Sequence, residues 1–312
     1  MDPAEIIRAC MERGILVSSE DLKLMEAGLS VEEFMASKTQ APQAPPQEEK
    51  AGKITYRLRK SKIAETVTPA EILEQRKSNH ETIKGLLLSK TSAVSISNAG
   101  EGQSVSLIGM VKRSGGGSFL LEDVTGEIEV SCPSGCNVSP GDVVCARGAV
   151  RGGRMLCSDV LYPDVPLLRS VGRIEATMLL VPGKGKPAAP ADIILSTEVV
   201  DTDSKNIVFS SSPTHLSVYR DGKVNVIFYR SDDEISQQDA IGMLKKRLLK
   251  KTRALVADEE SFLMEPVPDI LWIASRGGEW IETYKGVTIV HTPEDSVRQV
   301  VIDLKTREAR LI

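Results

Sequence analysis

The stretch SVSLIGMVKRSGGGSFLLEDVTGEIEV, residues 104–130, decides the fold of the middle of the chain. Apolar residues alternate with polar or small ones over 105–111, which is the period of a β-strand. Two further apolar runs, 119–123 (FLLED) and 127–130 (EIEV), lie on either side of the turn that ends at Gly126. Strand-like runs joined by a short glycine-containing turn are typical of a hairpin. The stretch therefore predicts three strands, of which the last two form a hairpin.

Two more strands are predicted directly after this stretch. One is 143–146 (VVCA), which follows the turn sequence PGD, and the other is 155–157 (MLC), which follows RGGR. Five short strands with glycines at the bends fit a small closed barrel. The order of these strands resembles an OB-fold, which we expect over residues 93–168.

The other parts of the chain divide into four segments. Residues 1–37 predict three short capped helices, and residues 38–52 (KTQAPQAPPQEEKAG) predict a flexible linker rich in Pro, Gln and Glu. Residues 53–92 predict a basic strand and a capped helix that lead into the barrel. Residues 169–312 predict a mixed α/β domain, with strand-like apolar runs at 176–181, 192–195, 206–209, 224–229, 270–273, 286–290 and 299–304. The basic strand carries Lys53, Arg57, Arg59, Lys60 and Lys62.

Composition excludes several classes of protein. The 312 residues include 39 Lys and Arg against 43 Asp and Glu, which gives a net charge of −4. A protein that depends mainly on phosphate contacts is usually basic, so a nucleic-acid coat is not expected. No apolar run approaches the ~20 residues of a membrane span, and the N-terminus lacks the pattern of a secretory signal. Five cysteines, an odd number, indicate reduced thiols and a cytoplasmic location.

Two groups of cations are candidate nucleic-acid-binding residues. The barrel contributes Lys112, Arg113, Arg151 and Arg154, and a helix predicted over 241–255 contributes Lys245, Lys246, Arg247, Lys250 and Lys251. OB-folds bind single strands through a basic groove and stacking aromatic rings. Phe119 and Tyr162 are the only rings in the barrel region, and we expect Phe119 in its core. A solvated charged face and a phosphate-facing or acidic-partner surface both remain open for these cations.

Neither a metal site, a cofactor nor a catalytic residue is expected from the motifs. Among the barrel cysteines only Cys132 and Cys136 form a close pair, whereas zinc sites usually combine two such pairs. Cys145 and Cys157 fall within predicted strands, where we interpret them as small buried hydrophobes. The loop GKGKP at 183–187 lacks the Ser or Thr of a P-loop.

From Glu71 onward the chain resembles the small subunit of the archaeal D-family replicative DNA polymerase. The resemblance is carried by collinear segments that cover most of the chain. These are EILEQRKSNHETIKGLLLSK (71–90), the barrel stretch quoted above, DVLYPDVP (159–166), IVFSSSPTHLSVYRDGKVNVIFYRSDDEIS (207–236) and EPVPDILWIASRGGEWIETYKGVTIVHTPEDSVRQVVIDLKTREARLI (265–312). The resemblance implies that a shortened calcineurin-like phosphoesterase domain follows the barrel.

The departures from this family concern its metal ligands. Active members hold two metals through Asp-x-His, Gly-Asp, Gly-Asn-His-Asp, His-Gly and Gly-His-x-His motifs, and a two-metal centre needs several such ligands. Here residues 181–184 read VPGK where Asp-x-His is expected, and 272–280 read WIASRGGEW where the last histidine motif is expected. The whole sequence has three histidines, His80, His215 and His291. The comparison therefore implies an inactivated phosphoesterase.

The function implied is a non-catalytic accessory subunit that scaffolds the large catalytic subunit of a D-family-like DNA polymerase. The complex in this family has DNA-directed DNA polymerase and 3′–5′ exonuclease activity, and DNA and the sliding clamp are further expected partners. One alternative is an active metal-dependent exonuclease with a rewired site. That site would be built from Asp201, Asp203, Asp232, Asp233, His215 and His291. The other alternative is a stand-alone OB-fold protein that binds single-stranded DNA.

Overall fold

The computed structural model describes residues 53–61, 68–133, 135–168, 170–202, 204–210, 212–250 and 262–312. These residues belong to a compact unit that begins at Lys53. The helices expected in residues 1–37 and the linker expected in residues 38–52 lie outside the described residues.

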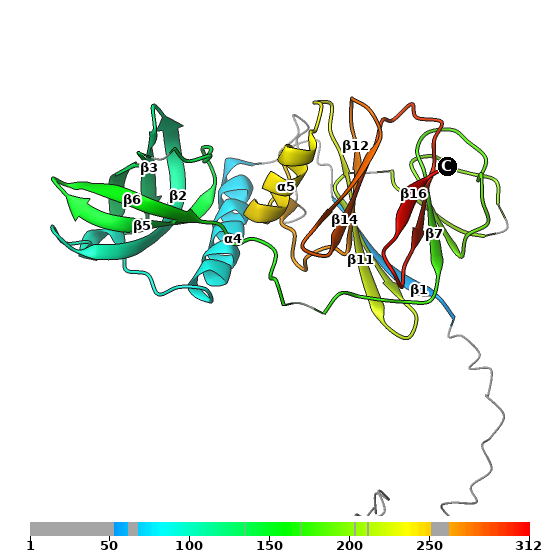
Figure 1. Cartoon of the computed structure of the whole chain (residues 1–312), viewed down its shortest axis with the longest axis horizontal. Helices are drawn as coiled ribbons and strands as arrows, with labels where there is room; N and C mark the ends of the chain where they lie inside the picture. Colours follow the sequence, from blue (N-terminus) through cyan, green and yellow to red (C-terminus); the bar gives the residue numbers. More distant parts are fainter. Residues whose placement is uncertain are drawn as a thin grey trace, which may run out of the picture. The chain divides into compact units, whose positions relative to one another are not determined.

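Five strands close into a barrel (Figure 1). They are β2 (Ser104–Gly115), β3 (Ser118–Asp123), β4 (Gly126–Ser131), β5 (Val143–Arg151) and β6 (Arg154–Leu161). Their order around the barrel is β2-β3-β4-β6-β5, with β5 pairing back to β2. Only the β4–β6 pair is parallel among the barrel strands. The predicted barrel and its β3–β4 hairpin are confirmed, and the barrel is compatible with an OB-like fold.

Close strand contacts explain two glycines of the barrel. A Cβ atom on Gly109 would lie 2.4 Å from the Glu122 carbonyl oxygen, and one on Gly148 would lie 2.0 Å from the Leu156 carbonyl oxygen. Both positions therefore require a residue without a side chain. The inward-facing residues include Phe119, which is only 2% exposed, as expected for a core ring.

One helix packs on the outside of the barrel. α4 (Pro69–Leu88) begins with proline, which suits the first helical position because its nitrogen needs no intrahelical acceptor. Its Ile83 and Leu87 are buried against Ile108, Val143 and Cys145 of β2 and β5. The short 3-10 helix η1 (Ile96–Asn98) connects α4 to the first barrel strand.

Two further sheets form the rest of the described unit. The larger sheet has the order β1-β10-β11-β12-β14-β13, and the smaller one has the order β16-β15-β7-β8-β9. Their bounds are β1 (Thr55–Lys60), β7 (Thr177–Val181), β8 (Ile193–Ser196), β9 (Lys205–Val208), β10 (Thr214–Tyr219), β11 (Lys223–Arg230), β12 (Ile270–Ala274), β13 (Trp280–Tyr284), β14 (Val287–Thr292), β15 (Val300–Asp303) and β16 (Ala309–Leu311). Strands β11, β12 and β14 run parallel, as do β7, β8 and β9.

A continuous apolar core joins the facing surfaces of these two sheets. Leu180 and Leu195 enter it from the smaller sheet, and Phe228 and Trp272 enter it from the larger sheet. The rings of Phe228 and Trp272 lie 4.9 Å apart between centroids. The opposite face of the larger sheet is covered in part by α5 (Gln237–Lys246), through Ala240, Met243 and Leu244.

Two expectations about these elements need correction. The helix predicted over 241–255 begins at Gln237 and ends at Lys246, because Arg247 takes a left-handed conformation with φ of 56°. The strand predicted at the start of residues 53–92 does form, as β1, but it pairs with β10 and so belongs to the larger sheet. Within the residues described, none of the helices has the length and apolar character that a membrane crossing requires.

Candidate site at the carboxyl ends of the parallel strands

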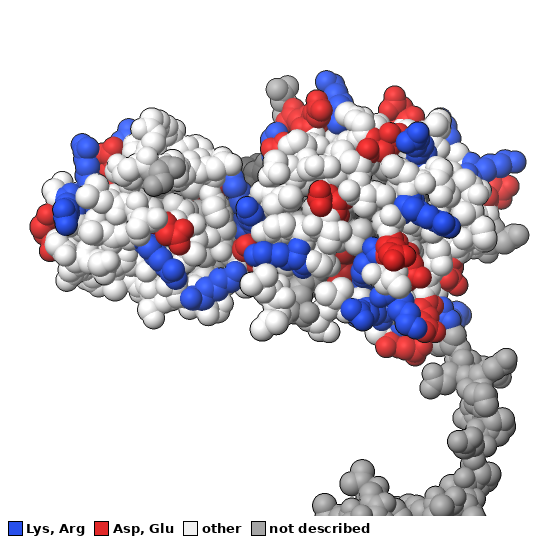
Figure 2. Space-filling view, in the orientation of Figure 1, with Lys and Arg blue, Asp and Glu red and all other residues white. Residues whose placement is uncertain are grey.

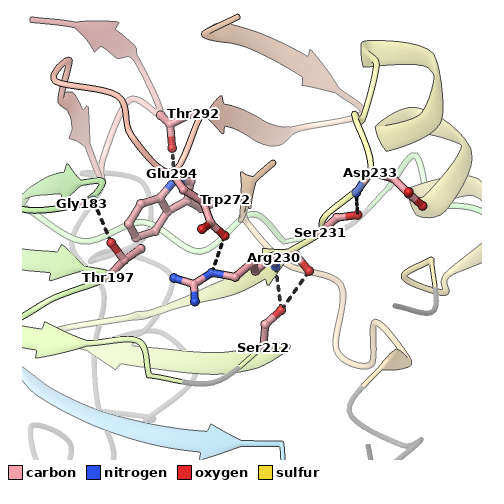
Figure 3. Close-up of polar contacts among 9 residues, drawn as sticks. All are labelled: Gly183, Thr197, Ser212, Arg230, Ser231, Asp233, Trp272, Thr292 and Glu294. Carbon is pink, nitrogen blue, oxygen red and sulfur yellow. Dashed lines mark hydrogen bonds and ion pairs between the residues drawn. The ribbon is translucent and has the colours of Figure 1, made fainter. Parts of the chain in front are cut away.

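The carboxyl ends of the parallel strands in both sheets are the natural place to look for a site. Open sheets with parallel strands bind ligands beyond this edge, where the loops leave the strands. Here the smaller sheet supplies Gly183 and Thr197 after β7 and β8, and the larger sheet supplies Arg230 and Glu294 after β11 and β14 (Figure 3). We call this group, together with Ser212 and Thr292, the carboxyl-edge cluster.

An ion pair occupies the cluster. Arg230 Nε lies 2.7 Å from Glu294 Oε1, and both side chains are partly exposed. The backbone N–H of Arg230 donates to Ser212 Oγ at 2.6 Å. Glu294, in the loop after β14, thus holds the guanidinium, whereas Ser212, in the loop before β10, holds the backbone of Arg230.

Gly183 joins two loops of the smaller sheet and lies close to a loop of the larger sheet. The Gly183 N–H donates to Thr197 Oγ1 at 2.8 Å, and Gly183 has a positive φ of 65°. A Cβ atom there would lie 2.9 Å from the Glu294 carbonyl oxygen. The loop after β7 therefore contacts the loop after β14 at Gly183.

Buried aromatic rings lie next to the cluster, and we call them its floor. Trp272 is fully buried, and its indole N–H donates to Thr292 Oγ1 at 2.9 Å. Its ring packs against Phe209 and Phe228. This floor offers no metal ligand, because an indole N–H is a donor only.

His291 is buried beside the cluster and both of its ring nitrogens are engaged. Nδ1 lies 2.8 Å from the Gly278 carbonyl oxygen, and Nε2 lies 2.7 Å from Ser275 Oγ. A carbonyl only accepts, so Nδ1 carries the proton and Nε2 accepts from the serine hydroxyl. The ring also stacks on the Trp280 ring, with 5.0 Å between the two ring centroids. Burial lowers the pKa of His291, so the ring is neutral near pH 7.

The residues of the alternative exonuclease site do not form a metal-binding group within the described part of the chain. No set of three or more His, Cys, Asp or Glu side chains there is placed to hold a metal ion. Asp233 pairs with Lys250 at 3.3 Å, and His215 lies on β10 opposite Arg59. Asp201 follows β8 and Asp232 follows β11. Asp203 lies outside the described residues.

Two of the four barrel cations predicted to bind nucleic acid have acidic partners. Lys112 pairs with Glu122 and Glu127, and Arg154 Nε lies 3.4 Å from Glu129 Oε2. Arg113 lines a shallow hollow that Glu129 also lines, and Arg151 is exposed where β5 turns into β6.

Most of the described cations that were predicted on the helix also form ion pairs or hydrogen bonds. Lys246 Nζ lies 2.8 Å from Asp142 Oδ2 in the loop before β5. Arg247 is 2% exposed and donates to the Met264 carbonyl oxygen and to Glu265. Lys245 is exposed, Lys250 pairs with Asp233 as described above, and Lys251 lies outside the described residues.

The barrel cysteines are free thiols. Burial raises the pKa of Cys132, Cys145 and Cys157. A thiol with a raised pKa holds its proton at neutral pH and is a poor nucleophile and metal ligand.

Comparisons with known proteins leave the family open. No protein-family model and no curated protein matches the chain. One solved structure to which the chain is similar is that of a Thermotoga maritima protein determined by solution NMR. It shares 10% sequence identity, covers 44% of this chain and 96% of its own, and has a TM-score of 0.26. A similarity this low carries no argument about fold or function.

Proposed function

We propose that this protein is a non-catalytic accessory subunit of a D-family-like replicative DNA polymerase, in which it scaffolds the large catalytic subunit. The observation that carries the proposal is the carboxyl-edge cluster. An Arg230–Glu294 ion pair and hydroxyl side chains lie at the carboxyl ends of the parallel strands, and the resemblance implies that an active member of that family would hold its two metals at such strand ends. The cytoplasm of an archaeal cell is the proposed location.

The chemistry of the cluster supports a non-catalytic role. Two-metal hydrolysis needs bridging carboxylates and imidazoles that hold two ions about 3.5–4 Å apart. A guanidinium at this position repels divalent cations, and the buried His291 uses its free lone pair to accept from Ser275. The described residues therefore offer an ion-paired surface where an active enzyme offers ligands.

The architecture supports the scaffold role. Two packed sheets follow the barrel along the chain, at the place where the resemblance implies a phosphoesterase-like domain. The segment between them carries two prominent leucines, Leu167 at 81% and Leu168 at 99% exposure. Exposed apolar side chains of this size are candidates for burial against a partner. We assign them to the contact with the large subunit.

Two assays on the purified full chain test the proposal. We expect no Mn²⁺-dependent 3′–5′ exonuclease activity, together with co-purification with the large subunit. The double variant Leu167→Ser/Leu168→Ser should reduce co-purification, whereas Val199→Ser, which is 88% exposed elsewhere, should not. Exonuclease activity that disappears in His215→Ala would overturn the non-catalytic assignment.

A further inference from the structure

The outer face of the larger sheet is divided into two halves of different character. Over β11, β12 and β14 it is apolar and lies under α5, through residues such as Tyr229 and Ile273. Over β1, β10 and the first residues of β11 the same face carries polar and cationic side chains. We call this second half the β1–β10 face.

Strand register determines which side chains form the β1–β10 face. Successive residues of a strand point to opposite sides, and directly paired residues point to the same side. On β1, Ile54 and Leu58 pack against the core between the sheets, so Thr55, Arg57 and Arg59 point outward. Their partners on β10 are Tyr219, Ser217 and His215, and Tyr219 and Ser217 pair in turn with Lys223 and Asn225 on β11.

The cations of this face have no acidic partner among the described residues, whereas several of the predicted cations, such as Lys112, Arg154 and Lys246, are ion-paired. Arg57 and Arg59 are exposed, and the described ion pairs involve neither of them, nor Lys53 and Lys223. Asp221, in the turn between β10 and β11, is an exposed acid two residues before Lys223. Basic and acidic groups lie close together over much of the visible surface (Figure 2). Arg57 and Arg59 lie about 6.7 Å apart along the strand, a spacing close to that of successive phosphates in an extended single strand.

An exposed aromatic ring lies on the same face. Two aromatic residues are exposed among the described residues: Tyr56 is 42% exposed and Tyr219 is 36% exposed. Tyr219 points outward with the arginines, and Lys223 Nζ lies 5.8 Å from its ring centroid. Tyr56 points to the other side of the sheet, where Lys205 Nζ lies 4.5 Å from its ring centroid. Only Tyr219 is therefore placed to act together with Arg57 and Arg59.

We propose that the β1–β10 face binds single-stranded nucleic acid, with phosphates at Arg57 and Arg59 and a base stacked on Tyr219. Proteins that bind single strands without sequence preference combine a cationic track with aromatic stacking, and this face supplies both. An acidic peptide would use the arginines but would leave the ring without a role. The surface is separate from every cation singled out in the sequence as a nucleic-acid contact, and it does not depend on the accessory-subunit proposal.

Fluorescence anisotropy of the full chain with labelled oligothymidylate tests this inference, with oligouridylate as a second probe that shows whether DNA or RNA is preferred. Arg57→Ala/Arg59→Ala should weaken binding about tenfold. It should also lower the slope of log K against log salt by about 1.4, because each phosphate contact to a single strand contributes about 0.7. Tyr219→Ala should weaken binding about tenfold through lost stacking, and Tyr219→Phe should restore it.

Matched controls separate the site from net charge and from folding. Arg276→Ala/Arg298→Ala removes the same charge from exposed positions outside β1, and Tyr56→Ala removes a ring from the opposite side; both should bind normally. Circular dichroism should show that every variant is folded. Equal losses in the two double variants would overturn the proposal, as would displacement of the oligonucleotide by polyglutamate at a similar concentration.

Basic residues on β1 could have another role, and that role predicts a different result in the binding experiment. Charged side chains on an edge strand discourage pairing with another molecule, and β1 lies at the edge of its sheet. If that were their role, Arg57→Ala/Arg59→Ala would self-associate and keep its affinity for oligothymidylate, which contradicts the binding site. Co-purification with the large subunit is measured separately, so failure of this inference and failure of the accessory-subunit proposal are distinguishable.

Discussion

Ser275 Oγ and His291 Nε2 lie 2.7 Å apart in a buried contact between the end of β12 and β14. A serine and a histidine in this geometry resemble part of a hydrolytic dyad, yet both side chains are at most 2% exposed. The His291 ring is further fixed by Gly278 and Trp280. The pair therefore completes the packing at this edge of the larger sheet, and its contribution to stability can be measured.

The stability of the protein should depend on pH through His291. Its pKa is lowered by burial, so below pH 6.5 the unfolded chain binds a proton that the folded protein does not. The stabilisation that comes from His291 should be fully present above pH 6.5. It should decrease as the pH falls toward the pKa of His291 in the folded protein. The loss is at most about 1.4 kcal/mol per pH unit. Urea unfolding at pH 7.5 and pH 5.5 measures it.

His291→Gln should remove this component of the pH dependence, although it lowers stability at both pH values. Thr292→Val, which changes a buried side chain that does not titrate, serves as the control and should keep the wild-type pH dependence. An unchanged difference between the two pH values in His291→Gln would contradict the assignment.

Gly109→Ala should destabilise the barrel. The new Cβ atom would lie 2.4 Å from the Glu122 carbonyl oxygen, so β2 and β3 would have to separate. We expect a loss of more than about 2 kcal/mol in the free energy of unfolding, as for other overpacked sites. Gly115→Ala on the same strand meets no atom within 4 Å and should change stability by about 0.5 kcal/mol or less. Thermal unfolding compares the two, and similar losses would count against the close contact.

Arg247→Met should reveal a structural role for a residue that looks like a nucleic-acid contact in the sequence. The buried guanidinium donates to the Met264 carbonyl oxygen, which would lose its partner. An unsatisfied buried acceptor costs about 1–3 kcal/mol. Lys245→Met changes the charge equally at an exposed position and should stay within about 0.5 kcal/mol of the wild type. Equal stability of the two variants in denaturant unfolding would show that Arg247 is dispensable.

Thr292→Val should destabilise the core between the two sheets. The change keeps the shape of the side chain but leaves the Trp272 indole N–H without its 2.9 Å acceptor, at a cost of about 1–3 kcal/mol. Thr283→Val on β13 is an exposed counterpart that should have little effect. Unfolding followed by tryptophan fluorescence measures both variants, and a Thr292→Val protein as stable as the wild type would rule out this role for the hydrogen bond.

Local patterns predict the barrel well because its strands follow one another closely. Alternating residues around Gly109 and the turn ending at Gly126 correspond directly to β2 and to the β3–β4 hairpin. The end of α5 could not be predicted in the same way. A run of lysines and arginines favours helix, whereas Arg247 leaves the helix to reach Met264, a contact that only the folded chain supplies.

The contacts of the candidate site could not be predicted from the sequence as the barrel was. Arg230 and Glu294 are separated by 64 positions and lie in two different segments of the chain, so the sequence did not indicate that they would pair. The same holds for Gly183 and Thr197, which hold loops from neighbouring strands together. The missing histidines led us to expect no metal ligands, but absent residues do not indicate which contacts form at the strand ends.

The pairing of β1 with β10 has a consequence for how the chain is made. A ribosome releases β1 long before β10, because the whole barrel is encoded between them. The β1–β10 pair can therefore form only after the barrel has been synthesised, and contacts so distant in sequence form slowly. A fragment that starts after the barrel would keep the other strands of both sheets but lose β1, exposing the backbone of β10. Attempts to express the two halves separately should carry residues 53–61 along with the second half.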